Sequence, residues 1–137
     1  MKVIKDNTYV YTPNKMRKKV QFFTSEDTVE GFDTDNNVTV NRDITKAGNG
    51  AGTGEVFTIN DTLSCDRHLE FWTMKDSSWS WKKAHELLIG DYLFTARNRV
   101  VRIDKINIVH EVIKGSIITA DNFFAGEYLV RWVIEYY

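Results

Sequence analysis

The residues of this sequence whose side chains could take part in rearranging a peptide bond include Cys65, His68 and Asp121. A thiolate is a nucleophile, a histidine moves protons near neutral pH, and a carboxylate can relay them. Cys65 needs a neighbouring cation or helix end to lower the pKa of its thiol. Among the residues that can carry a positive charge, only Arg67 and His68 lie close to Cys65 in sequence. We therefore predict a buried, unreactive thiol at Cys65, a structural role for His68, and a turn-ordering role for Asp121.

Cys65 and His68 also have the residue types of half a zinc site. Zinc requires about four ligands, or three and a water molecule. The other histidines are His85 and His110, and Cys65 is the single cysteine. Nothing in the spacing brings these histidines to Cys65. The sequence therefore predicts no metal site and no cofactor.

A glycine cluster occupies positions 48, 50, 52 and 54. Glycine suits unusual backbone angles, so the cluster predicts a flexible hairpin tip. It lacks the lysine and hydroxyl residue that complete a phosphate loop. A nucleotide or other small-molecule substrate is not expected.

The bulk composition predicts one globular domain spanning residues 1–137. Hydrophobic residues make up 42% of the chain and the formal net charge is −1. This balance gives no reason to expect nucleic acid or a membrane as a partner. No segment reads as a signal peptide or a transmembrane span. We expect a soluble protein, intracellular or part of a virion.

Period-two alternation of apolar residues dominates the sequence and predicts an all-β fold. One segment departs from it: residues 81–88 have apolar spacing typical of a helix, with Ser80 as its cap and Gly90 at its end. The predicted strands cover residues 38–42, 56–59, 63–65, 100–109, 117–120 and 128–134.

Three segments, taken in order, resemble the Hint domain, the fold shared by inteins and hedgehog autoprocessing domains. They are residues 63–72 (LSCDRHLEFW), 79–94 (WSWKKAHELLIGDYLF) and 117–132 (IITADNFFAGEYLVRW). The resemblance implies a compact β fold with pseudo-two-fold duplicated strands and one short helix. An echo between residues 28–33 and 87–93 fits such a duplication. In this resemblance His68 matches the family histidine, Cys65 replaces the usual threonine, and Asp121 matches an acidic residue.

The departures from the family pattern concern the residues that would carry autoprocessing. The nucleophile of the family aligns with Val3, which has no lone pair. Arg131 and Trp132 stand in place of the final histidine and asparagine. Arginine stays protonated and cannot act as a general base, and tryptophan has no amide to cyclise. Few residues are expected before Val3 or after Trp132 to be excised or joined. The resemblance therefore implies a Hint scaffold without splicing chemistry.

The C-terminal strand carries large apolar groups on both faces, as a buried or partner-binding strand does. Tryptophan and tyrosine are also enriched at interface anchors. The basic residues at positions 15–19 are interpreted as a solvated turn. We therefore expect a protein-binding surface made by Trp79, Trp81, Trp132, Ile134, Tyr136 and Tyr137.

Three hypotheses for function follow. The favoured one is a non-catalytic assembly module that binds another protein or itself through edge strands, with a phage or virion as its expected setting. The second is an autoprocessing domain with residual peptide-bond chemistry at Cys65, His68 and Asp121. The third is a nucleic-acid-binding module, which the near-neutral charge disfavours.

Overall fold

The protein is built almost entirely from β-strands. The structure, a computed structural model, describes residues 3–132, without the side chains of residues 52 and 53. Its short 3-10 turns are η1 (Pro13–Lys15), η2 (Val20–Phe22) and η3 (Ala84–Glu86). The strands are β1 (Ile4–Lys5), β2 (Tyr9–Thr12), β3 (Met16–Lys19), β4 (Thr28–Asp33), β5 (Val38–Asp43), β6 (Lys46–Ile59), β7 (Leu63–Asp66), β8 (Glu70–Lys75), β9 (Ser78–Lys83), β10 (Tyr92–Phe94), β11 (Val100–Arg102), β12 (Ile106–Thr119), β13 (Phe123–Ala125) and β14 (Tyr128–Arg131).

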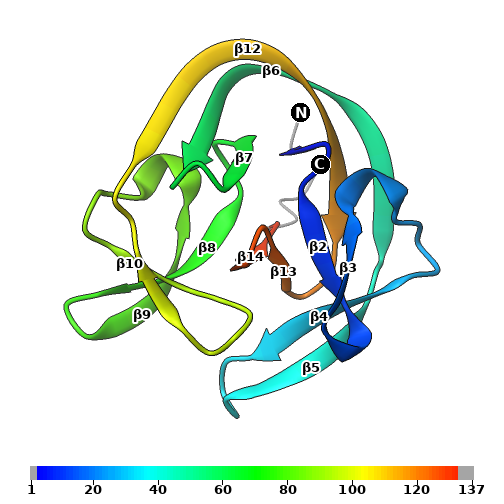
Figure 1. Cartoon of the computed structure of the whole chain (residues 1–137), viewed down its shortest axis with the longest axis horizontal. Helices are drawn as coiled ribbons and strands as arrows, with labels where there is room; N and C mark the ends of the chain where they lie inside the picture. The colour runs from blue at the N-terminus through cyan, green and yellow to red at the C-terminus, as the bar shows by residue number, and fades with distance from the viewer. Residues whose placement is uncertain (1–2, 133–137) are drawn as a thin grey trace.

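Two long strands, β6 and β12, form an arch that joins the two halves of the molecule (Figure 1). They pair antiparallel over their full length of 14 residues each, from Ile106 opposite Ile59 to Thr119 opposite Lys46. With β1 and β7 they close a small barrel. A second sheet runs in the order β11–β10–β8–β14–β13–β2–β3, with β9 paired to β8, and β4 and β5 form a separate hairpin.

The first half of the chain contains a carboxylate that fixes the turn before β4. Asp27 accepts hydrogen bonds from the Thr24 main-chain amide at 2.8 Å and from the Lys18 ammonium at 2.9 Å. The Thr24 amide and then Lys18 hold the pKa of Asp27 below its ordinary value of 3.8. The turn therefore depends on a charged Asp27.

The second half repeats this arrangement before β10. Asp91 accepts hydrogen bonds from the Leu88 main-chain amide at 3.0 Å and from the Lys82 ammonium at 3.4 Å. Each carboxylate follows a strand hairpin and a 3-10 turn, and immediately precedes a strand. The predicted duplication is thus confirmed. The sequence echo had aligned Gly31 with Gly90, whereas the structure aligns Asp27 with Asp91.

Two local predictions were wrong. Residues 81–88 do not form a helix: Trp81 lies in β9, directly opposite Trp72 of β8, and only η3 turns as a helix does. Cross-strand pairing with β8 outweighs the helical spacing here. The glycine cluster is not a hairpin tip either, because it lies inside β6 and pairs residue by residue with β12.

The main hydrophobic core lies between the barrel and the second sheet. Its members Phe71, Phe123, Leu93 and Ile118 are almost fully buried. Burial of such side chains contributes about 1.5–3 kcal/mol each. Among the residues that the structure describes, no helix has the length and apolar character of a membrane span.

Candidate functional site

The first and last described strands meet at the segment between β7 and β8. The Val3 carbonyl accepts a hydrogen bond from the Asp66 amide at 3.0 Å, and Ile4 lies opposite Cys65 in the barrel. At the other end, Arg131 pairs with Glu70, the first residue of β8. Residues 66–70 therefore lie between two positions: Val3, which the Hint resemblance aligns with the family nucleophile, and Arg131, which it aligns with the final histidine.

The side chain of Val3 consists only of aliphatic carbon. Its side chain is buried, 2% exposed, and packs with Val56 and Ile113. A Cβ at Gly115 would lie 2.7 Å from the Val3 Cβ, so β12 passes directly against it. The position is built as core packing and contains no nucleophile.

The Cys65 thiol belongs to the hydrophobic core. It is fully buried, and burial raises the pKa of the thiol well above its ordinary range, with the nearby Asp66 charge adding to the effect. A thiol that stays protonated is a poor nucleophile. The prediction of a buried thiol is confirmed for Cys65, and its lack of reactivity stays a prediction.

His68 lies in the turn after β7 rather than on a strand. Its main-chain amide donates to the Asp66 carboxylate at 2.7 Å, and its ring is half-buried. The ring meets that of His85 edge-on, with centroids 6.1 Å apart, because the His85 amide is bound to the Arg67 carbonyl. The spacing of the histidines in the sequence does not indicate this pair. No group of three or more potential metal ligands occurs among the described residues.

Arg131 is held in place by two neighbours. Its Nε and Nη2 atoms each lie 3.0 Å from Glu70 Oε1, and its guanidinium lies 4.3 Å from the centroid of the Trp81 ring. The Glu70 side chain is only 10% exposed, so this ion pair is partly shielded from water. Trp132 is buried, and its indole Nε1 has no partner among the described residues. Both side chains are engaged in packing and pairing.

Asp121 lies with the β4–β5 hairpin. Its carboxylate is 78% exposed and pairs with Arg42 at 3.1 Å. None of the interactions in the described part of the chain joins it to Cys65 or His68. The structure therefore brings two of the three predicted residues into one segment and assigns the third to a different contact.

The Asn122 side chain binds β4. Its Oδ1 accepts from the Phe32 amide at 2.8 Å, and its Nδ2 donates to the Phe32 carbonyl at 2.9 Å. One side chain thus replaces a neighbouring strand on the outer edge of β4. A Cβ at Gly31 would lie 2.6 Å from Asn122 Oδ1, so this close approach requires glycine.

The β8–β9 hairpin and β10 present a set of aromatic rings, Trp72, Trp79, Trp81 and Phe94, called here the aromatic surface. Trp72 stacks on Trp79 with centroids 5.9 Å apart and lies 5.0 Å from Trp81. The three tryptophans are half-buried. Trp79 and Trp81 were named from the sequence, whereas Trp72 and Phe94 were missed, although hairpin pairing could have indicated Trp72.

The remaining predicted interface residues do not join the aromatic surface. Trp132 lies in the core, and Ile134, Tyr136 and Tyr137 lie outside the described residues. The expected surface therefore reduces to its two tryptophans of β9 and their neighbours.

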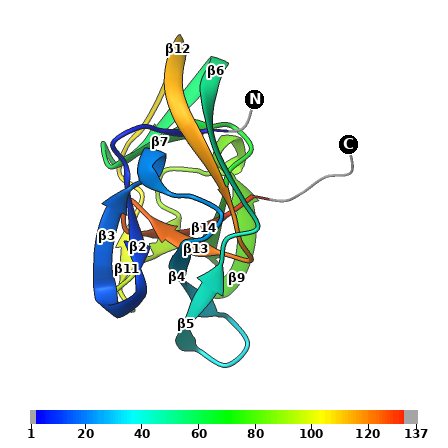
Figure 2. The same ribbon diagram turned by 90° about the vertical axis from the view of Figure 1, so that its right-hand side faces the viewer.

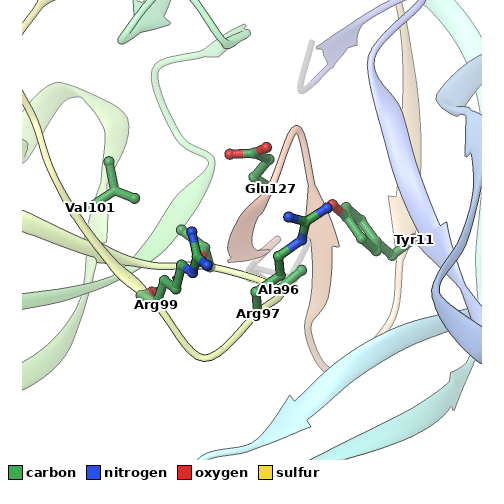
Figure 3. Close-up of a pocket in the computed structure, with 7 residues that line it drawn as sticks. Tyr11, Ala96, Arg97, Arg99, Val101 and Glu127 are labelled. Carbon is green, nitrogen blue, oxygen red and sulfur yellow. The ribbon is translucent and has the colours of Figure 1, made fainter.

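A small pocket lies on another part of the second sheet (Figure 3). It has a volume of about 120 Å³ and lies between the β10–β11 turn, which carries Arg97 and Arg99, and the β13–β14 turn, which carries Glu127. Glu127 has a positive φ of 94° next to Gly126 at 54°, as a tight two-residue hairpin turn requires. Residues 66–70 contribute nothing to its lining, so the pocket is separate from the segment described above.

No protein-family model and no curated protein sequence matches the chain. Solved structures match over almost the whole length. The bacterial intein-like domain from Clostridium thermocellum has a TM-score of 0.79 at 18% identity, covering 96% of this chain and 99% of that one. The DnaB intein from Synechocystis sp. PCC 6803 has 0.73 at 13%, covering 98% and 100%. The TvoVMA intein has 0.77 at 12%, covering 94% and 96%.

These similarities define the class of the protein: the chain has the Hint fold of inteins. The all-β prediction and the family resemblance are both confirmed. At these identities the likeness extends to the fold and no further, because a fold can be retained while its chemistry changes.

Proposed function

We propose that this protein is a non-catalytic Hint scaffold whose function is to bind a protein partner. One observation carries the proposal. At the two positions that the family resemblance aligns with the autoprocessing residues, one side chain packs in the core and the other forms an ion pair. Val3 is buried aliphatic carbon, and Arg131 is bound to Glu70 and Trp81. Acyl transfer requires a nucleophile and a base within reach of each other.

Autoprocessing through Cys65, His68 and Asp121 is the alternative. In its favour, Cys65 and His68 lie in or beside the segment that binds the Val3 carbonyl. Against it, burial keeps the Cys65 thiol protonated, and Asp121 is paired with Arg42. A fusion of the chain between two reporter domains, incubated with dithiothreitol, separates the two functions. Intact fusion supports the scaffold, and release of either reporter supports autoprocessing.

For the binding role we propose the aromatic surface as the contact. Half-buried tryptophans combine large apolar area with few rotamers, which is typical of interface anchors. A W79S variant should lose a protein that co-purifies from the native source, whereas F22S, which changes an exposed ring outside the aromatic surface, should retain it. Equal retention by both variants would contradict this assignment.

A phage or viral particle is the setting that we propose for this binding. Detection of the chain by mass spectrometry in purified particles, at constant ratio to a structural protein, would support it. Recovery of the chain only from the soluble fraction of infected cells would contradict it.

A further inference from the structure

Among the residues that the structure describes, no strand lies beside one edge of the arch. Over residues 106–113, β12 pairs with β6 on one side only, because β1 reaches the other side at Gly115 and Ser116. On the left of Figure 1 this part of β12 forms the outer rim of the arch, and Figure 2 shows the arch rising above the rest of the molecule. The edge is therefore accessible to another strand.

The main-chain groups of this edge are oriented for pairing. The Asp6 amide donates to the Lys114 carbonyl at 3.0 Å, on the side of β12 away from β6. Strand geometry alternates this direction with every residue, and the register with β6 is unbroken. Ile106, Ile108 and His110 therefore direct their amides and carbonyls outward, with no strand to receive them among the described residues.

The same edge carries exposed apolar side chains. Ile108, Val109 and Val112 are 51%, 45% and 69% exposed. Natural edge strands are usually protected by lysine, proline or a bulge. Residues 106–113 contain neither lysine nor proline, and their continuous register excludes a bulge. Such an edge is suited to strand addition.

We propose that a second copy of this chain pairs antiparallel with β12 about a two-fold axis at Ile108. This register places Lys105 of one copy opposite Glu111 of the other, and the symmetry forms that pair twice. Lys105 directly precedes β12, and its carbonyl still accepts a hydrogen bond from the Asn60 amide at 2.9 Å. Because it is an even number of positions from Glu111, its side chain falls on the same face of the extended chain. Opposite charges directly across two strands favour pairing.

The same register brings one apolar side chain of each copy together. Ile108 meets its own copy on the axis, and Asn107 lies opposite Val109. The result is a self-complementary contact, as a two-fold interface requires. This inference deepens the proposed binding function and rests on it for its role, but it concerns a surface distinct from the aromatic surface.

The test is sedimentation velocity of the purified chain over about a hundredfold range of concentration. The wild type should shift from monomer to dimer. E111K places lysine opposite Lys105 twice and should raise the dissociation constant by about tenfold or more. The double variant K105E/E111K restores opposite charges and should recover most of the dimer. Lys105 also contacts Asp61 at 3.2 Å, so E111K is the cleaner single change.

A second variant keeps the proposal open to refutation. I108K brings two ammonium groups together on the axis and should abolish the dimer. V38K, which changes a valine of β5 that is 48% exposed, should leave it intact. A wild type that stays monomeric throughout, or a dimer unaffected by both I108K and E111K, would overturn the proposal. The reporter-fusion assay reads chemistry independently of association, so the two failures are distinguishable.

Discussion

Replacement of Asn122 by alanine should unfold the protein at markedly lower temperature. The side chain is 7% exposed and makes two hydrogen bonds to Phe32, at 2.8 and 2.9 Å. Without it the Phe32 amide loses its partner inside the protein. The Phe32 carbonyl keeps a weaker bond from Arg42 at 3.3 Å. An orphaned buried amide costs about 1–3 kcal/mol, and a lost hydrogen bond about 1 more, so N122A should cost about 2–4 kcal/mol.

For a domain of this size that loss corresponds to a Tm lower by about 10 °C. Tryptophan fluorescence during thermal and urea unfolding measures it. D121A is the matched control, because its exposed ion pair with Arg42 contributes about 0–1 kcal/mol. G31A should destabilise as N122A does, because it crowds the same contact. If N122A were within about 0.5 kcal/mol of the wild type, or no worse than D121A, the strand-replacing role of Asn122 would be wrong.

Three further predictions follow from single contacts. The Cys65 thiol should resist a thiol reagent at about pH 8 until urea unfolds the chain, and prompt native labelling would show that it is not buried. Because the folded pKa of Asp27 lies below 3.8, its stabilisation is present above that value and is lost as pH falls through the folded pKa. D27N should therefore lose less stability than the wild type between about pH 4 and pH 2 in thermal scans, and parallel curves would refute this. R131M should destabilise by about 1–3 kcal/mol, because it leaves the Glu70 carboxylate without its partner. R131M/E70Q should recover part of that loss in urea unfolding, and purely additive effects would contradict the coupling.

The sequence indicated the fold because strand alternation and motif order are local signals. It missed contacts that depend on chain segments far apart. Asn122 and Phe32 are 90 residues apart, and no spacing rule joins them. His85 reaches His68 because the chain returns along β9, which pairs with β8. A helix over residues 81–88, as the apolar spacing predicts, would not bring the two histidines together.

Local preference was also overruled by pairing at the glycine cluster. Glycine alone favours a turn, yet β6 is held extended by its unbroken pairing with β12, in which Ile117 lies opposite Gly48 and Ile113 opposite Gly52. The duplication was expected from the family resemblance, but the sequence echo did not have its register. Asp27 and Asp91 make equivalent contacts, while the surrounding residues differ enough to obscure their alignment.

The central claim is that the closing positions of this Hint scaffold lack the groups that rearrange a peptide bond. The most direct test is the intact mass of the chain fused to a reporter at each end, after long incubation with hydroxylamine, which cleaves esters and thioesters. We expect one species at the full mass of the fusion. A fragment whose mass places a break beside Val3 or Trp132 would contradict the claim.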